Sequence, residues 1–138
     1  MVDVMTKPVI TRKRQLMYLF MVIGRYLSIK YDKYVPMGKR LYLISGKYPL
    51  VSKESHDLVE FALRLSKTIN EDDSVKKFMR FIYIPNYSVS LCELIVPATD
   101  VSHHISAPGT EPSGTSNMKV AMTGGIILGS KTGSNIEM

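Results

Sequence analysis

The sequence is poor in cysteine and has no long apolar run. Cys92 is the only cysteine among the 138 residues, so no disulfide can form within the chain, which favours a reducing compartment. The most apolar run, residues 16 to 24, is far shorter than the roughly 20 residues that span a bilayer. The first ten residues lack the charged-then-apolar order of a signal peptide. These absences predict a soluble, cytoplasmic protein.

A continuous run of lysine or arginine is also absent, although the formal net charge is +6. The basic residues are scattered along the chain, and no nucleic-acid recognition motif accompanies them. A positive excess of this size suits phosphate-bearing ligands, but it also suits plain solubility. We therefore expect no nucleic-acid partner and no membrane partner.

Hydrophobic residues make up 45% of the chain, enough for the core of about one domain. Residues 11–31 show a helical apolar period, with Thr11 as the expected N-cap and a core-facing stripe of Leu16, Leu19, Phe20, Ile23 and Leu27. A second helix is expected over about 55–69, with an apolar face of Leu58, Phe61, Ala62, Leu65 and Ile69.

Short apolar runs between these helices predict strands. Strands are expected at 40–45, 78–84 and 126–130, short helices at 87–95 and 114–122, and irregular chain over 97–113. Alternation of helix and strand is typical of an α/β fold with a parallel sheet. We predict a partial Rossmann-like parallel sheet of three or four strands, with helices on both faces and both edges open.

Residues 109–119, GTEPSGTSNMK, form a glycine- and hydroxyl-rich loop that enters a helix. Free backbone N–H groups and the helix dipole at such a point suit a phosphate. Glu111 can accept hydrogen bonds from sugar-type hydroxyls. Lys119 lies one turn into the helix, and a buried lysine amine with a lowered pKa suits a Schiff base with pyridoxal phosphate. The same pattern also fits a plain helix cap with a solvated lysine.

The stretch resembles the pyridoxal-phosphate lysine motif of the α-glucan (glycogen, starch) phosphorylases, which usually reads GTEASGTGNMK, so that only Pro112 and Ser116 differ. NYSVSL (86–91), VPATDVS (96–102) and GSNIEM (133–138) are similar to family segments around the same site. RKRQL (12–16) and SGK (45–47) are similar to the start of the family's carboxyl-terminal domain. The resemblance runs in one order over about 3–138.

The resemblance implies a two-domain GT-B architecture, in which two Rossmann-like domains face a cleft. It implies transfer of a glucosyl unit from an α-1,4-glucan to orthophosphate, which gives glucose 1-phosphate. The phosphate of the pyridoxal 5'-phosphate cofactor acts there as a proton relay. The family is commonly homodimeric. On this basis residues 1–138 are expected to be part of the carboxyl-terminal, cofactor-binding domain, with the amino-terminal domain absent.

Site residues are carried over from the family position by position. The implied catalytic residues are Lys13, facing the substrate phosphate, and Lys119, which carries the cofactor as a Schiff base. The implied contacts are Thr115, Ser116, Tyr87 and Lys7 to the cofactor phosphate, and Glu111, Ser113 and Gly114 to the glucosyl hydroxyls. Without the resemblance, Lys7 and Lys13 would be interpreted as surface charges and Tyr87 as the edge of a core.

Several positions depart from the family pattern. Pro8, Ile10 and Arg12 stand where the family usually has arginine, histidine and tyrosine, and Ser88 replaces a second arginine. Losing an arginine removes a bidentate phosphate donor that lysine does not replace well. The Cβ of Ser116 replaces glycine beside the expected phosphate. We therefore expect the isolated chain to lack phosphorylase activity.

Other hypotheses remain at this stage. A nucleotide-sugar glycosyltransferase of GT-B type fits the E-P-x-G pattern at 111–114, but Lys119 stands where such enzymes have a second carboxylate. A truncated, non-enzymatic product fits the departures. A metal site at His103, His104 and Cys92 lacks a second suitably spaced ligand pair. Cys92 as a nucleophile lacks an argued base, and a small apolar role suits it better.

Overall fold

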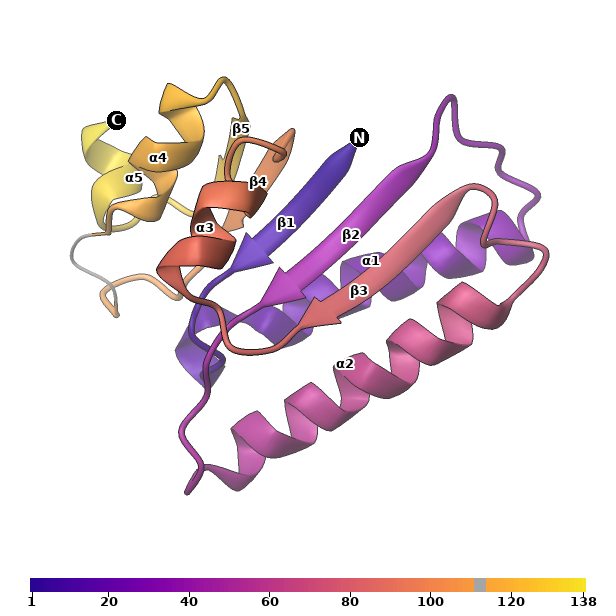
Figure 1. Cartoon of the computed structure of the whole chain (residues 1–138), viewed down its shortest axis with the longest axis horizontal. Coiled ribbons are helices and arrows are strands. Elements are labelled where there is room, and N and C mark those ends of the chain that lie inside the picture. Colours follow the sequence, from indigo (N-terminus) through magenta and orange to yellow (C-terminus); the bar gives the residue numbers. More distant parts are fainter. Residues whose placement is uncertain (111–113) are drawn as a thin grey trace.

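Five parallel strands form one sheet in the computed structural model, which describes residues 1–110 and 114–138 (Figure 1). The strand order across the sheet is β3-β2-β1-β4-β5. The strands are β1 (Val2–Thr6), β2 (Arg40–Ser45), β3 (Met79–Ile84), β4 (Val101–His104) and β5 (Ile126–Gly129). The predicted α/β class with a parallel sheet is confirmed.

Two of these strands were not expected from the sequence. β1 carries Asp3, and β4 consists of a valine, a serine and two histidines, so neither shows an apolar run. The structure nevertheless buries Asp3, Ser102, His103 and His104. The expectation of irregular chain over 97–113 is therefore wrong at β4, because the central position of a strand in the sheet, rather than its own composition, imposes the burial.

Helices cover both faces of the sheet, as predicted. They are α1 (Gln15–Lys30), α2 (Lys53–Glu71), α3 (Val89–Ile95), α4 (Ser116–Met122) and α5 (Ser134–Glu137), with a 3₁₀ turn η1 (Thr11–Lys13) before α1. The helices α1 and α2 pack on one face, whereas α3 packs on the other. Connections between parallel strands are right-handed, so reversing direction along the sheet after β3 puts the next helix on the opposite face. None of the helices in the described ranges combines the length and the apolar content needed to cross a membrane.

The start of α1 differs from the prediction. Thr11 opens the 3₁₀ turn rather than capping α1, and the residue before the helix is Arg14, whose φ of 59° lies in the left-handed region. A side chain at such a φ is uncommon, and here the conformation separates the short turn from the helix. The predicted helix over 11–31 is thus two helical segments joined at Arg14.

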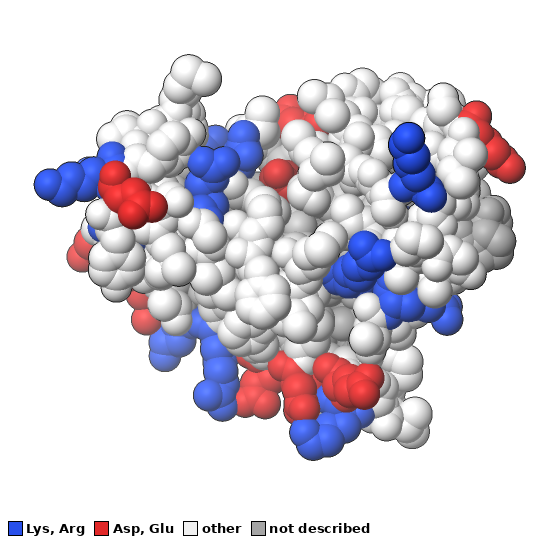
Figure 2. Space-filling view, turned by 180° about the vertical axis from the view of Figure 1, so that it is seen from behind, with Lys and Arg blue, Asp and Glu red and all other residues white. Residues whose placement is uncertain are grey.

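The predicted apolar stripe of α1 is also largely wrong. Leu19 is buried, but Leu16, Phe20 and Leu27 are 44%, 59% and 43% exposed. The residues of α1 that face the core are Tyr18, Leu19, Val22, Tyr26 and Ile29. Tyrosines supply much of this face because a buried aromatic ring can still keep its hydroxyl hydrogen-bonded. Seen from behind, the middle of the molecule over α1 is accordingly a broad uncharged surface (Figure 2).

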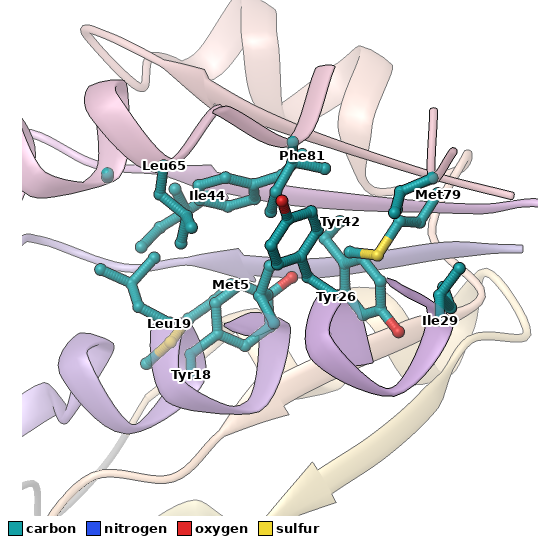
Figure 3. Packing of buried hydrophobic residues seen from close by; sticks show 14 residues of the cluster. Met5, Tyr18, Leu19, Tyr26, Ile29, Tyr42, Ile44, Leu65, Met79 and Phe81 are labelled. Carbon is teal, nitrogen blue, oxygen red and sulfur yellow. The ribbon is translucent and has the colours of Figure 1, made fainter. Parts of the chain in front are cut away.

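The main core lies between the sheet and the pair α1 and α2 (Figure 3). Met5, Tyr42, Ile44, Met79 and Phe81 from the three strands β1 to β3 meet the inner faces of both helices. The prediction for α2 holds for its inner residues, since Ala62, Leu65 and Ile69 are buried, but Phe61 is 36% exposed. Ser52 caps this helix by accepting the backbone N–H of Ser55 at 3.2 Å. A smaller cluster on the opposite face packs α3 against Val4 and Leu43.

Candidate functional site

The strand order reverses between β1 and β4, and ligands of open parallel sheets bind at the carboxyl ends of the strands at such a switch point. Lys7 directly follows β1, and Ser106 lies two residues beyond β4. Both side chains are buried, with Lys7 only 8% and Ser106 only 3% exposed. The chain therefore brings a cationic and a hydroxyl side chain to the position where the fold favours a ligand.

Lys7 is held from several directions. Its ammonium Nζ donates to the Oγ of Ser116 at 3.0 Å, and its backbone N–H donates to Ser45 O at 3.0 Å. The side-chain amide of Gln15 donates to the carbonyl of Pro8 at 2.7 Å, which fixes the turn that follows Lys7. Burying an ammonium is costly unless it is hydrogen-bonded. The interpretation of Lys7 as a surface charge is therefore wrong: it is a buried amine directed at the start of α4.

A narrow hollow of about 10 Å³ lies beside this amine, room for about one water molecule. Its lining is rich in polar groups: Lys7, His104, Ser106, Gly114, Thr132, Ser134 and Asn135. One ammonium surrounded by hydroxyl and amide donors is the chemistry of a small anion site, because charge-assisted hydrogen bonds to an anion are the strong ones.

Two asparagines that the site prediction did not include hold its walls together. Asn117, 1% exposed, donates to Ser134 Oγ at 2.8 Å and to Asn135 Oδ1 at 2.9 Å. Asn135 in turn donates to the carbonyl of His104 at 3.1 Å. These contacts join α4, α5 and the end of β4. Both asparagines lie in segments similar to the phosphorylases, so the resemblance was the available signal for them.

Tyr87 lies beside the end of β1, half-buried against the cluster of α3. Burial, and then a hydrogen bond with Cys92, raises the pKa of Tyr87 to about 12, although a hydrogen bond with Thr6 opposes this. Its hydroxyl is therefore protonated at neutral pH and remains a hydrogen-bond donor. Because Thr6 immediately precedes Lys7, Tyr87 belongs to the same carboxyl edge of the sheet. It also lies at the edge of a core cluster, as its residue type had suggested.

The remaining predicted site residues differ in burial. Lys13 is buried in η1, and the backbone N–H of Ala107 joins that turn to the chain after β4 through the carbonyl of Arg12 at 2.9 Å. Thr115 is exposed at the N-cap of α4, and Lys119 is exposed one turn later. Lys119 was expected to be a buried amine, whereas the buried lysines are Lys7 and Lys13. The predicted residues Glu111 and Ser113, together with Pro112, lie outside the described residues.

Two positions that depart from the phosphorylase pattern have local roles. Ser88 is the N-cap of α3, where its Oγ accepts the backbone N–H of Leu91 at 3.3 Å. Ser116 accepts one donor of the Lys7 ammonium. Pro8 and Arg12, which stand where the family has arginine and tyrosine, are exposed. The described part of the edge therefore carries lysines and hydroxyls but no arginine among the hollow's lining residues.

The adjacent histidines point to opposite faces of the sheet, as alternation in a strand requires. His103 Nε2 lies 2.8 Å from Asp3 Oδ1 under α1, and its ring meets Tyr18 edge-on with the ring centres 4.8 Å apart. His104 Nε2 lies 2.9 Å from Ser102 Oγ on the other face. Within residues 1–110 and 114–138, no three His, Cys, Asp or Glu side chains are grouped closely enough to hold a metal ion.

Comparisons with known proteins agree with the resemblance. The family model described as Carbohydrate phosphorylase matches residues 1–138. The chain is 41% identical to glycogen phosphorylase 2 of Dictyostelium discoideum over 136 residues, which are 99% of this chain and 14% of that protein. It is 36% identical to the glycogen phosphorylase of Haemophilus influenzae over 99% of this chain and 17% of that protein.

The same holds for a plant relative. The chain is 36% identical to the chloroplastic/amyloplastic α-1,4 glucan phosphorylase L-1 isozyme of Solanum tuberosum, over 100% of this chain and 15% of that protein. The chain thus spans 14 to 17% of the length of these three relatives. A family match over every residue and relatives from three distant groups of organisms lead to one conclusion: this chain belongs to the carbohydrate phosphorylase family.

Proposed function

We propose that this chain is the cofactor-holding part of an α-glucan phosphorylase and that it binds pyridoxal phosphate at the carboxyl edge of its sheet. The observation that carries the proposal is the buried ammonium of Lys7, hydrogen-bonded to Ser116 at the topological switch point. In the full enzyme the reaction would be glucosyl transfer from an α-1,4-glucan to orthophosphate, and the cofactor phosphate would supply a proton relay beside the substrate phosphate.

The residues present fit a phosphate group. The Lys7 ammonium and the hydroxyls of Ser106, Thr132 and Ser134 line one hollow. These groups are donors suited to phosphate oxygens. Lys119, three residues after Ser116 on α4, is exposed, so its amine is accessible to an aldehyde that approaches from outside. We assign covalent attachment to Lys119 and phosphate binding to Lys7.

Ser116 also explains why cofactor binding should be weaker here than in the family. Its hydroxyl accepts a hydrogen bond from Lys7 at 3.0 Å, so a phosphate has to compete for one of the amine's donors. The hollow, at about 10 Å³, is also smaller than a phosphate group, so Ser116 and Lys7 have to move apart on binding. The usual glycine at position 116 would place neither a hydroxyl nor a Cβ there.

We further propose that the chain by itself does not turn over glucan. Two positions where the family uses arginine are Pro8 and Ser88, and Ser88 is occupied in capping α3. Lys13 remains as a cation for substrate phosphate, but one ammonium does not replace a bidentate guanidinium. Orthophosphate would then be held too loosely for the positioning that glucosyl transfer requires.

Borohydride trapping with pyridoxal phosphate, followed by peptide mapping, tests the proposal. A reduced adduct at Lys119 that is absent in Lys119→Ala is the expected result. Lys131→Ala, which removes another exposed amine, is the matched control and should retain the adduct. Ser116→Gly should raise the affinity for the cofactor, because it frees the Lys7 donor.

Other outcomes would overturn the proposal. Equal labelling of many lysines, or labelling unchanged in Lys119→Ala, would mean that the site does not bind the cofactor and that the chain is a non-enzymatic product. Release of glucose 1-phosphate from glycogen and orthophosphate by the purified chain would contradict the proposed lack of turnover.

Lys7→Met should weaken cofactor binding without changing which lysine is labelled.

A further inference from the structure

Five cationic side chains surround a second hollow at the opposite edge of the sheet, where β2 and β3 begin. Lys39, Arg40, Lys76, Lys77 and Arg80 line it, together with Phe78 and Met79, and no carboxylate is among its lining residues. Its volume is about 310 Å³, within the usual range of small-molecule sites. In Figure 2, Lys and Arg side chains lie toward the upper left, the end at which these strands begin, with acidic side chains beside them.

The strands force these cations together. Arg40 pairs with Met79 in register, and its backbone N–H donates to Phe78 O at 2.9 Å, so the residues just before β2 and β3 lie side by side. Lys39, Arg40, Lys77 and Arg80 thereby lie close to one another at the start of this strand pair and line the same hollow. Like charges held this close repel one another and favour an anion between them.

Little in the described part of the chain neutralises the cluster. Asp73 pairs with Lys76, and Asp72 of the same turn pairs instead with Lys30 at 2.8 Å. For Lys39 and Lys77, by contrast, the described residues offer no acidic partner within 4.0 Å. Lys77 instead lies over the ring of Phe78, 5.0 Å from its centre.

An apolar hollow of about 300 Å³ adjoins the cationic one and shares four of its lining residues, Lys39, Arg40, Phe78 and Met79. Its further walls include Tyr34, Pro36 and Met37. Arg25 lies over the Tyr34 ring at 5.0 Å, which presents an aromatic face backed by a cation. A cationic and an aromatic compartment therefore adjoin, and one ligand can occupy both.

We propose that this end of the molecule binds a small polyphosphate that carries an aromatic ring. Its phosphates lie among Lys39, Arg40, Lys77 and Arg80, and its ring lies against Tyr34 and Pro36. The site uses the amino ends of the strands, whereas the proposed cofactor site uses their carboxyl ends. The two sites share no lining residue, so a test that refutes one proposed site leaves the other unaffected.

Titration calorimetry of the full chain at low ionic strength tests the proposal, with adenosine diphosphate and inorganic tripolyphosphate as separate probes. Lys39→Gln/Lys77→Gln should weaken the binding of both probes by about tenfold or more, since each lysine supplies a charge-assisted contact. Arg64→Gln/Lys67→Gln on α2 removes the same charge from exposed positions away from the hollow and should change either affinity by less than about twofold. Tyr34→Ala should weaken only the binding of adenosine diphosphate.

The proposal would be overturned by the absence of binding of either probe at about 1 mM, by equal weakening in the two charge variants, or by an unchanged affinity of Tyr34→Ala for adenosine diphosphate. A single-stranded oligonucleotide that binds far more tightly than both probes, through the same lysines, would identify a nucleic-acid surface instead and would also overturn it. Lys39 and Lys77 are exposed, so an unchanged thermal midpoint is expected for their variant and verifies that it folds. Labelling of Lys119 by pyridoxal phosphate should be the same in this variant and in the wild type.

Discussion

Replacing Gly46 with alanine is expected to destabilise the fold strongly. Gly46 follows β2 and lies against the chain that leaves β1. A Cβ at this position would overlap the carbonyl oxygen of Lys7, lie 3.0 Å from the carbonyl carbon of Lys7 and lie 3.1 Å from a methyl group of Val9. The backbone of Lys7 cannot simply move away, because Lys7 N–H donates to Ser45 O at 3.0 Å and Val9 N–H donates to Lys47 O at 2.8 Å.

The size of the effect follows from these contacts. Overpacking of a tight site costs about 1–3 kcal/mol. Lengthening one of the two hydrogen bonds that flank Gly46 costs about 1 kcal/mol more. We therefore expect Gly46→Ala to lower the free energy of unfolding by about 2–4 kcal/mol. The displaced backbone belongs to Lys7, so the variant should also weaken the binding of pyridoxal phosphate.

Urea unfolding followed by far-ultraviolet circular dichroism measures this change, with the slope of the transition kept as a check on two-state behaviour. Gly24→Ala is the matched control: Gly24 is exposed within α1 and a Cβ there meets nothing within 4 Å. Alanine should stabilise that helix by about 0.5–1 kcal/mol. A Gly46→Ala free energy of unfolding within about 0.5 kcal/mol of the wild type, the usual range of a neutral surface change, would show that a Cβ fits at this position without strain.

Three further predictions concern single contacts. The hydrogen bond from the Lys30 ammonium, followed by those from nearby hydroxyls, lowers the pKa of Asp72 below its ordinary 3.8. The Asp72 carboxylate therefore stabilises the fold above pH 3.8, and this contribution is lost as the pH falls below that value. Asp72→Asn should accordingly reduce the loss of stability at acid pH in a profile of unfolding free energy against pH. Ser52→Ala removes the cap of α2 and should cost about 1 kcal/mol in urea unfolding. His103→Ala removes the ring that lies 2.8 Å from Asp3 Oδ1 and packs edge-on against Tyr18, so it should cost about 0.5–3 kcal/mol, seen as a lower thermal midpoint, whereas no change would show that these contacts contribute nothing.

The sequence predicts most of the fold where side-chain pattern and burial agree. The strand at 40–45 has the predicted bounds, and those at 78–84 and 126–130 differ by one residue. The pattern fails for β1 and β4, whose buried polar residues have partners that only the assembled sheet supplies. His103, for example, lies against Asp3, which is 100 residues earlier in the chain. It fails again on α1, where tyrosines rather than the regular leucine stripe form the buried face.

The candidate site, like the fold, could be predicted from the sequence only in part. The resemblance located Lys7, Tyr87 and Ser116, and the structure places them at the same edge of the sheet. Residue type alone predicted Lys7 to be an exposed charge, because nothing in a single sequence shows that Ser116 lies within reach of its amine. Burial of Lys119 was expected from the chemistry of amines, yet the packing of α4 buries Asn117 and Val120 and leaves Lys119 exposed.

The central place of β1 in the sheet has a consequence for how the chain unfolds. The strands β2 and β3 on one side and β4 and β5 on the other are hydrogen-bonded to each other only through β1 in the described residues. Residues 1–6 thus join the two halves of the sheet, although the halves follow one another directly along the chain and β1 precedes them both. Backbone amides in β2 and β4 should exchange with solvent at a common, slow rate, since opening either half requires the release of the same strand. Deletion of those six residues should abolish the slow exchange on both sides at once.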